Sequence, residues 1–249
     1  MEETANRQFV ELEQTHFWFV GRRAIFFHLL DRELAGRSDL RVLDVGCGAG
    51  GMLEPLSRYG EVWGIDTSQE LIDFCHERGF PKTRLGSAYE LPVQDGTVDL
   101  LTMFDTIEHV PQDIRALREC RRALAPDGRL FISTPAYQFL YANNDRVAHH
   151  ERRYTATQLR MALTEAGLEP VRITYFNTLL FPAILPAVLA GKLRERFVDP
   201  GDRTNLSREL PPAVNRALAA TMSSERRLLE RIDFPFGHSL IAIARPGSA

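Results

Sequence analysis

The sequence predicts an α/β protein whose core is a parallel β-sheet covered by helices on both faces. Short apolar runs and amphipathic stretches alternate along most of the 249 residues, which is typical of βαβ units. Gly46, Gly48 and Gly51 follow the first apolar run, where such folds place a tight turn between strand and helix. The alternation stops before the last candidate strand, so we expect an insertion there.

Four strand signals occur in the first half of the chain, each a short run that ends at a turn. They are "LRVLDVG", "EVWGID", "TRLGS" and "VDLLTMFD". A helix over residues 22–35 precedes them, and a second helix ends at Gly60. Thr67 and Glu70 have capping-box spacing for the third helix, which ends at Gly79 in the position after the C-cap.

The second half continues the same alternation. Pro111 suits a first helical turn, so a helix is expected from there to Leu124. "APDG" predicts a turn, and "RLFISTP" and "PVRITYF" predict the fifth and sixth strands. Between these strands, Thr155 and Gln158 cap a helix that ends at Gly167. "SLIAIARP" predicts the last strand, and a further helix over 212–231 precedes it.

Composition and charge are those of an ordinary globular protein. Hydrophobic residues make up 44% and charged residues 25%, and the net charge of −3 gives no reason to expect a nucleic-acid partner. Cys47, Cys75 and Cys120 lack C-x-x-C spacing, which argues against a disulfide framework or a zinc knuckle. The polar start "MEETANRQFVELEQ" is unlike a secretory signal. A reducing, cytoplasmic location is therefore expected.

One apolar segment bears on that location. The 19 residues "ITYFNTLLFPAILPAVLAG", between Arg172 and Lys192, carry no formal charge, and a membrane-spanning helix needs about 20 such residues. Pro182 and Pro186 interrupt the segment, so a buried or partner-facing helix is the favoured interpretation. The alternative is a peripheral contact with a membrane surface or a lipid over residues 173–191.

The glycine motif fits two classes of ligand. It matches the G-x-G-x-x-G pattern of dinucleotide-binding enzymes, and it also reads D-x-G-x-G-x-G from Asp44 to Gly50. The carboxylate of Asp44 is unfavourable beside a pyrophosphate and favourable beside the sulfonium or ammonium group of S-adenosylmethionine. No tyrosine is followed by lysine four residues later, as dehydrogenase chemistry would need, and no G-K-[ST] phosphate loop occurs. The sequence therefore favours a cationic nucleoside over NAD.

Four motifs in series carry a resemblance to a known family. "VLDVGCGAGG", "GIDTSQELI", "GSAYELPVQDGTVDLLTMFDTIEHVPQ" and "RALAPDGRLFISTP" resemble, in order and spacing, the motifs of class I S-adenosylmethionine-dependent methyltransferases. The resemblance covers roughly residues 40–175. "HFWFVGRR" and the long C-terminal insertion resemble a bacterial small-molecule branch of that family, whose members are often associated with lipid, quinone or glycan pathways.

The resemblance implies a Rossmann-like sheet of seven strands with an antiparallel last strand and a helical insertion between strands six and seven. It implies a single domain over residues 1–249. Within it we expect an N-terminal lid and helix over 1–38, a cofactor-binding core over 39–176, a substrate cap over 177–236 and the final strand over 237–249.

The resemblance also implies cofactor-binding roles. Many members have aspartate at the position of Ser87, so this chain departs from the usual adenine contact there. In "THFWFVGRR", Trp18 is a candidate lid and Arg22 a candidate partner for the cofactor carboxylate, with simple packing on the sheet as the alternative. The family pattern places Asp44, Gly46, Cys47 and Gly48 at the methionine part, Asp66 and Thr67 at the ribose, Ser87 and Ala88 at the adenine, and Phe104 and Asp105 over the cofactor.

Candidate catalytic residues follow the fourth and fifth strands. "DTIEHV" supplies His109 and "AHHERRY" supplies His150 and Tyr154. Either histidine is a candidate general base, and a pocket-wall role is the alternative for Tyr154. The D-x-x-E-H pattern with a later histidine also resembles metal sites of ubiquinone-pathway and small-RNA 2′-O-methyltransferases. Because E-H is common in relatives without metal, no metal is expected, and helix capping is the remaining alternative.

The predicted activity is methyl transfer from S-adenosyl-L-methionine to an oxygen, nitrogen or carbon nucleophile of a small acceptor, leaving S-adenosyl-L-homocysteine. A hydrophobic or lipid-linked acceptor is expected from the apolar insertion. The alternative is a non-catalytic methyltransferase-like protein that binds the cofactor or serves as a partner subunit. The intact glycine loop and Asp66 argue against that alternative.

Overall fold

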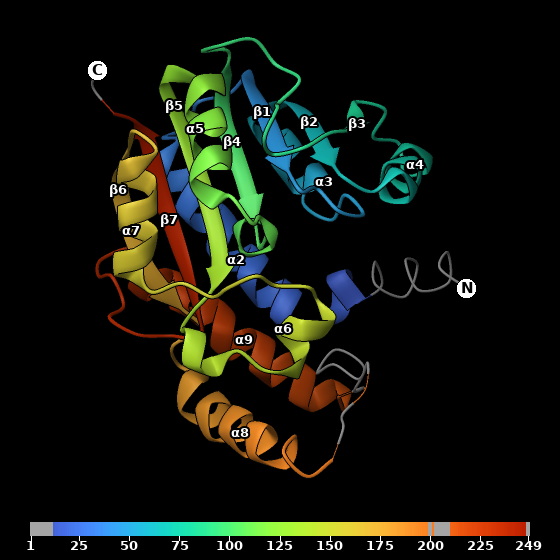
Figure 1. The fold of residues 1–249 in the computed structure, drawn as a ribbon, viewed down its shortest axis with the longest axis vertical. Coiled ribbons are helices and arrows are strands. Elements are labelled where there is room, and N and C mark those ends of the chain that lie inside the picture. Colours follow the sequence, from blue (N-terminus) through green and yellow to red (C-terminus); the bar gives the residue numbers. More distant parts are fainter. Residues whose placement is uncertain (1–11, 199–200, 202–209, 248–249) are drawn as a thin grey trace.

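The computed structural model describes residues 12–198, 201 and 210–247. Its centre is a seven-stranded sheet in the order β3-β2-β1-β4-β5-β7-β6 (Figure 1). β7 pairs antiparallel with β5 and β6, and the other neighbours pair in parallel. The predicted fold class is therefore confirmed, including the antiparallel last strand. The strands are β1 (Leu40–Val45), β2 (Gly60–Asp66), β3 (Thr83–Leu85), β4 (Val98–Phe104), β5 (Leu124–Pro135), β6 (Leu168–Phe176) and β7 (Ser239–Pro246).

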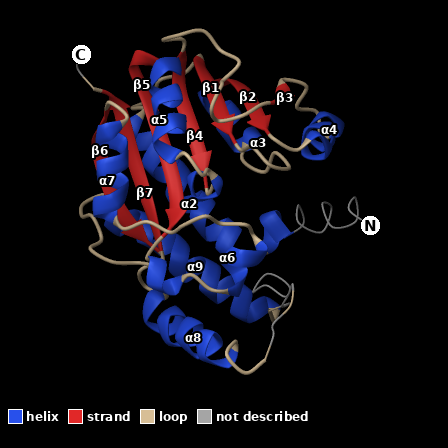
Figure 2. Ribbon diagram, viewed as in Figure 1, coloured by secondary structure: helices blue, strands red, loops and turns tan. Residues whose placement is uncertain are grey.

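Helices cover both faces of the sheet. Figure 2 shows α5 (Asp113–Ala123) and α7 (Ala156–Glu165) in front of the sheet, and α2 (Phe17–Glu33) behind it. On the α2 side, the ring of Phe26 lies 5.3–5.4 Å, centroid to centroid, from Phe104, Phe131 and Phe176. These rings come from β4, β5 and β6, so a single helical residue joins three strands in the core. The remaining core-region helices are α3 (Leu53–Leu56), α4 (Gln69–Glu77) and α6 (Asn143–Val147).

Three local expectations need correction. The N-cap of α4 is Ser68, whose hydroxyl accepts from the backbone N–H of Leu71, so Thr67 does not cap the helix. Helix α5 begins two residues after Pro111, at Asp113, because Gln112 still has a non-helical backbone. The "APDG" segment lies within β5 as an irregularity in its pairing with β4. By contrast, the capping box of Thr155 and Gln158 is confirmed at the start of α7.

The insertion between β6 and β7 contains α8 (Phe181–Arg194) and α9 (Pro212–Leu229). α9 packs along α2, where a Cβ on Gly21 would lie 2.6 Å from the sulfur of Met222. Asn215 of α9 also accepts from the backbone N–H of Phe17 at 2.8 Å. The insertion therefore holds the N-terminal helix in place. Both helices lie beyond the end of the sheet toward which β4 and β5 point (Figure 1). Within the described residues, no helix is both long and apolar enough to cross a membrane.

Candidate functional site

The glycine loop lies where the strand order reverses, at the carboxyl ends of β1 and β4, which is where open α/β sheets bind ligands. The backbone N–H groups of Gly46 and Cys47 donate to the carbonyl of Ile65 at 2.8 and 3.0 Å and fix the loop to β2. Gly46 has φ +75°, and a Cβ there would lie 2.5 Å from Thr106. Gly48 has φ +54°, and no atom lies within 4 Å of a Cβ built on it. The loop is therefore tight on one side and open to a ligand at Gly48.

Asp66 joins this loop to the next helix. One of its carboxylate oxygens accepts from the N–H of Gly48 at 2.9 Å, and the other accepts from the N–H of Ser68 at 2.9 Å. Each oxygen keeps a second lone pair that can accept a ribose hydroxyl. Thr67 is exposed beside it.

Asp44 is a buried carboxylate at the end of β1. It is 2% exposed, and one oxygen accepts from the hydroxyl of Thr102 at 2.6 Å. Burial raises the pKa of Asp44 to about 7 against the opposing effect of the Thr102 hydrogen bond, and the charge of Asp66 raises it further. A cation beside this carboxylate would remove the desolvation penalty. The site therefore fits the sulfonium and ammonium groups of S-adenosylmethionine, as the sequence predicts.

Arg22 and Asp105 form an ion pair with each other at the tip of β4. Asp105 has φ +50°, and its carboxylate also accepts from the hydroxyl of Ser133 at 2.9 Å. A left-handed backbone is uncommon at residues other than glycine, although aspartate tolerates it better than most. The structure thus brings Arg22 to the glycine loop, but its charge is shared with Asp105. Phe104 lies just behind, buried against Phe26.

The segment after β3 lies beside Asp66, because the N–H of Gly86 donates to the carbonyl of Asp66 at 2.9 Å. The hydroxyl of Ser87 accepts from the N–H of Tyr89 at 3.2 Å, and the half-buried Ala88 packs against the core. These two expected adenine-edge residues therefore adjoin the expected ribose site.

Trp18 does not lie over the glycine loop. Its ring stacks on Phe176 of β6 at 6.0 Å and meets His238 edge-on at 5.9 Å. Phe176 ends β6, and His238 directly precedes β7. The ring of the lid candidate therefore packs at the β6 and β7 side of the sheet.

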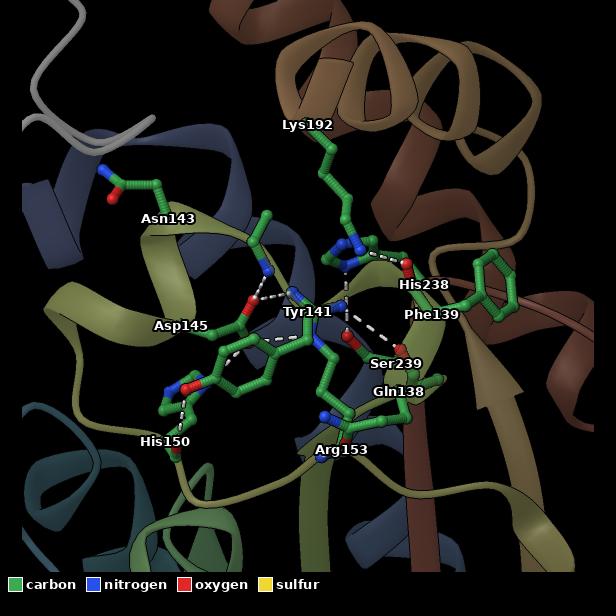
Figure 3. A network of polar contacts seen from close by, with 12 residues as sticks. Gln138, Phe139, Tyr141, Asn143, Asp145, His150, Arg153, Lys192, His238 and Ser239 are labelled. Carbon is green, nitrogen blue, oxygen red and sulfur yellow. Dashed lines mark hydrogen bonds and ion pairs between the residues drawn. The ribbon is translucent and has the colours of Figure 1, made fainter. Parts of the chain in front are cut away.

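A second polar group surrounds His150. Its Nδ1 lies 2.8 Å from an oxygen of Asp145, and Arg153 donates to both oxygens of that carboxylate at 2.7 and 3.0 Å. Although burial opposes it, hydrogen bonds from His150 and Arg153 lower the pKa of Asp145 to about 2. Figure 3 shows these side chains gathered below α8, from which Lys192 donates to the carbonyl of Phe139 at 2.7 Å.

His109 lies next to His150, with ring centroids 4.6 Å apart. Partial burial and the neighbouring His150 lower the pKa of His109, which favours its neutral form. Glu108 is fully buried, and neither carboxylate oxygen has a well-formed hydrogen bond within the described part of the chain. Burial, and then the charge of Asp105, raise the pKa of Glu108. One ligand atom from each of these three residues lies within 4.8 Å of the others, so the cluster could also hold a divalent ion.

Tyr154 does not join this group. Its hydroxyl donates to the carboxylate of Asp113 at 2.7 Å, and the side chain is 4% exposed. Burial and the hydrogen bond to Asp113 raise the pKa of Tyr154 above its ordinary value. Tyr154 therefore ties the loop after β5 to the start of α5.

Sequence reasoning missed Glu13 and Asp145. Asp145 lies in the same short segment as His150, so a search for a carboxylate near a candidate base would have found it. Glu13 precedes the glycine loop by more than thirty residues and has no sequence signal. Its carboxylate nevertheless lies against Gly51, where a Cβ would be 2.1 Å from the Oε2 atom.

Comparison with known proteins agrees with this geometry. A family model described as a methyltransferase domain matches residues 43–132. A probable S-adenosylmethionine-dependent methyltransferase of Mycolicibacterium smegmatis is 30% identical over 67% of this chain and 65% of that protein. A ubiquinone biosynthesis O-methyltransferase of Xanthomonas oryzae pv. oryzae is 38% identical over 41% of this chain and 44% of its own length. The chain thus spans less than two thirds of the length of either relative.

Among solved structures, the fold is similar to that of a geranyl diphosphate methyltransferase in complex with S-adenosylmethionine. The TM-score is 0.58 at 18% identity, over 91% of this chain and 85% of the other. At this identity the likeness shows a shared fold.

Proposed function

Because the chain belongs to the class I S-adenosylmethionine-dependent methyltransferases, we propose that it transfers a methyl group from that cofactor to a small-molecule acceptor. The observation that carries the proposal is the buried Asp44 carboxylate beside a glycine loop that is open at Gly48. Neutral or anionic nucleotides would leave this carboxylate uncompensated. The cofactor, when bound, supplies an electrophilic methyl group on a sulfonium.

The chain's own residues then bind and orient the cofactor. Asp44 would offset its positive charge, and Asp66 would accept from its ribose hydroxyls. Arg22 would pair with its carboxylate in exchange for the contact with Asp105. Ser87 and Ala88 would border the adenine. Because methyl transfer is an in-line displacement, the protein contributes mainly alignment and exclusion of water.

We propose His150 as the general base where the acceptor is a hydroxyl or an amine. If its Nδ1–H donates to Asp145, its Nε2 is left free to accept a proton. Asp145 then stabilises the imidazolium, and Arg153 holds Asp145 ionised. His109, neutral and adjacent, is the second candidate. A positioned base contributes about 10²- to 10⁴-fold to the rate.

A divalent ion held by Glu108, His109 and His150 is the alternative to a histidine base. Such an ion would orient an acceptor oxygen and lower its pKa. Elemental analysis of the purified protein, together with turnover before and after chelation, separates the two mechanisms. A histidine base predicts turnover that survives removal of all bound metal.

The acceptor side supports a hydrophobic substrate. The ring of Tyr137 lies 5.2 Å from that of Tyr175 and 6.1 Å from that of Phe181, centroid to centroid. Phe181 begins α8, and residues 181–198, α8 with the turn after it, are called the α8 segment below. Near the end of this segment, Leu193 is 56% and Phe197 81% exposed. The name of the Xanthomonas relative adds a quinone-pathway acceptor as one candidate. We therefore propose an apolar, lipid-like acceptor that the protein meets at a membrane surface from the cytoplasm.

The test of the proposed function is incubation with methyl-labelled cofactor and fractionated cell extract, followed by mass spectrometry of labelled products. We expect one labelled apolar small molecule and stoichiometric S-adenosylhomocysteine. A protein that binds the cofactor in calorimetric titration yet labels nothing in any fraction would favour the non-catalytic alternative. Tight binding of NADH in place of S-adenosylmethionine would contradict the cofactor assignment.

A further inference from the structure

Deepening the proposed function, and resting on it, we propose that Glu13 is a positioning residue for the cofactor's amino-acid tail and accepts a hydrogen bond from its ammonium group. Glu13 belongs to the segment before α2, and its carboxylate lies directly on Gly51 of the glycine loop. It is therefore a second acid, beside Asp44, that faces the loop.

The carboxylate of Glu13 is buried, and its hydrogen bonding within the described residues is incomplete. The residue is 8% exposed, and its Oε2 atom has no hydrogen-bond partner within the described residues. A buried carboxylate oxygen without a donor is costly, since it loses its water without replacement. Burial accordingly raises the pKa of Glu13, even against the attraction of nearby arginines. A ligand that brings an N–H donor and a positive charge would satisfy this oxygen.

Among the residues that the structure describes, none donates to this oxygen, although three guanidinium groups lie nearby. Arg22 is paired with Asp105, and Arg78 donates to the carbonyl of Ala49. Arg23 donates to the backbone carbonyl of Glu13 itself at 2.7 Å, so this hydrogen bond orients the segment and does not satisfy Oε2. Asp44 is a further charged neighbour, and its pKa is raised in part by the charge of Glu13. Two buried acids that repel each other are thus held at one loop.

The ammonium group is the part of the cofactor that matches Glu13. The loop and Asp66 place the nucleoside beyond Gly48, and Glu13 lies at the opposite end, on Gly51. An ammonium carries three donors, and two carboxylates from different segments would fix its direction. Because α2 begins shortly after Glu13, an ammonium group bound by Glu13 would also be linked to this N-terminal helix.

The test is Glu13→Gln, which keeps shape and removes charge. Calorimetric titration compares three ligands: S-adenosylmethionine, S-adenosylhomocysteine and 5′-methylthioadenosine, which lacks the whole amino-acid tail. We expect affinity for the first two to fall by the same factor, about tenfold, as for the loss of a hydrogen bond to a charged group. Affinity for 5′-methylthioadenosine should not change.

Glu54→Gln is the matched control, because Glu54 is an exposed acid just after the same loop. It should leave all three affinities unchanged, and thermal unfolding should show both variants folded. Several results would overturn the proposal: a loss confined to S-adenosylmethionine, an equal loss for 5′-methylthioadenosine, no loss, or tighter binding, which would mean that Glu13 competes with the cofactor carboxylate. If the unmodified chain binds none of the ligands, the proposed function itself is wrong.

Discussion

Two buried aspartates on opposite sides of the site differ in how their charge is compensated. Asp44 is 2% and Asp145 is 0% exposed, yet burial raises the pKa of Asp44 to about 7. Hydrogen bonds from His150 and Arg153 hold the pKa of Asp145 at about 2, in spite of its burial. The difference lies in the partners, because Asp44 has one hydroxyl donor and Asp145 has a guanidinium and an imidazole. Within the described residues, Asp44 thus lacks the directly bonded cation that Asp145 already has.

The largest effect is expected where the ion pair between Asp145 and Arg153 is broken. Arg153→Met should lower the free energy of unfolding by about 3–5 kcal/mol, because it leaves the buried Asp145 charge without its main partner. Chemical denaturation at pH 7 measures this loss. The double variant Asp145→Asn with Arg153→Met should regain part of the stability. If the single variant unfolds like the unmodified protein, the network has no structural role.

His150→Ala should next remove the proposed base while leaving cofactor affinity unchanged. Turnover of a hydroxyl or amine acceptor should fall about 10²- to 10⁴-fold, measured with the acceptor found by methyl labelling. His109→Ala is the comparison and should have the smaller effect, because within the described residues no hydrogen bond to a carboxylate orients its ring. Equal losses in both variants, together with loss of bound metal, would instead support the metal-ion alternative.

At the glycine loop, the affinity for S-adenosylmethionine is expected to depend on pH through Asp44. Asp44 must lose its proton to face a cation, so affinity for S-adenosylmethionine should fall by up to about tenfold per unit as pH drops below 7. Calorimetry at pH 5.5 and pH 8 measures this change. Asp44→Asn should bind weakly at both pH values and lose most of the dependence. A dependence that survives in Asp44→Asn would belong to another group.

The same pKa values predict opposite effects on the stability of the unliganded protein. Between pH 4 and 7 the folded state holds a proton on Asp44 that the unfolded state has lost, so the free energy of unfolding falls as pH rises. Asp145 does the reverse: it stabilises the fold above about pH 4, and this contribution is lost as pH falls toward 2. Asp44→Asn should therefore be more stable than the unmodified protein at pH 8, and Asp145→Asn less stable.

The two sides also differ in how far they follow from the sequence. Asp44, Gly48 and Asp66 lie within a few residues of strand ends, so the strand pattern alone places them together. The residues around His150 depend on tertiary packing of the loop after β5, which periodicity does not describe. Trp18 shows the limit most clearly, because the direction of its ring depends on the packing of α2 against β6 and α9. Glu13 could not be found for the same reason.

The smallest expected effect concerns the binding of the α8 segment to a lipid bilayer. Leu193 is 56% exposed, and Arg194 and Arg196 flank it, so an anionic bilayer would meet apolar and cationic groups together. Leu193→Ser should reduce the fraction of protein that floats with anionic vesicles by about fivefold, as for loss of about 1 kcal/mol of apolar burial. Leu85 on β3 is also 56% exposed, so Leu85→Ser is a matched control far from α8. Equal effects of the two substitutions would show that the α8 segment has no special contact with lipid. Only a loss specific to Leu193 would connect the acceptor side of the site to the bilayer.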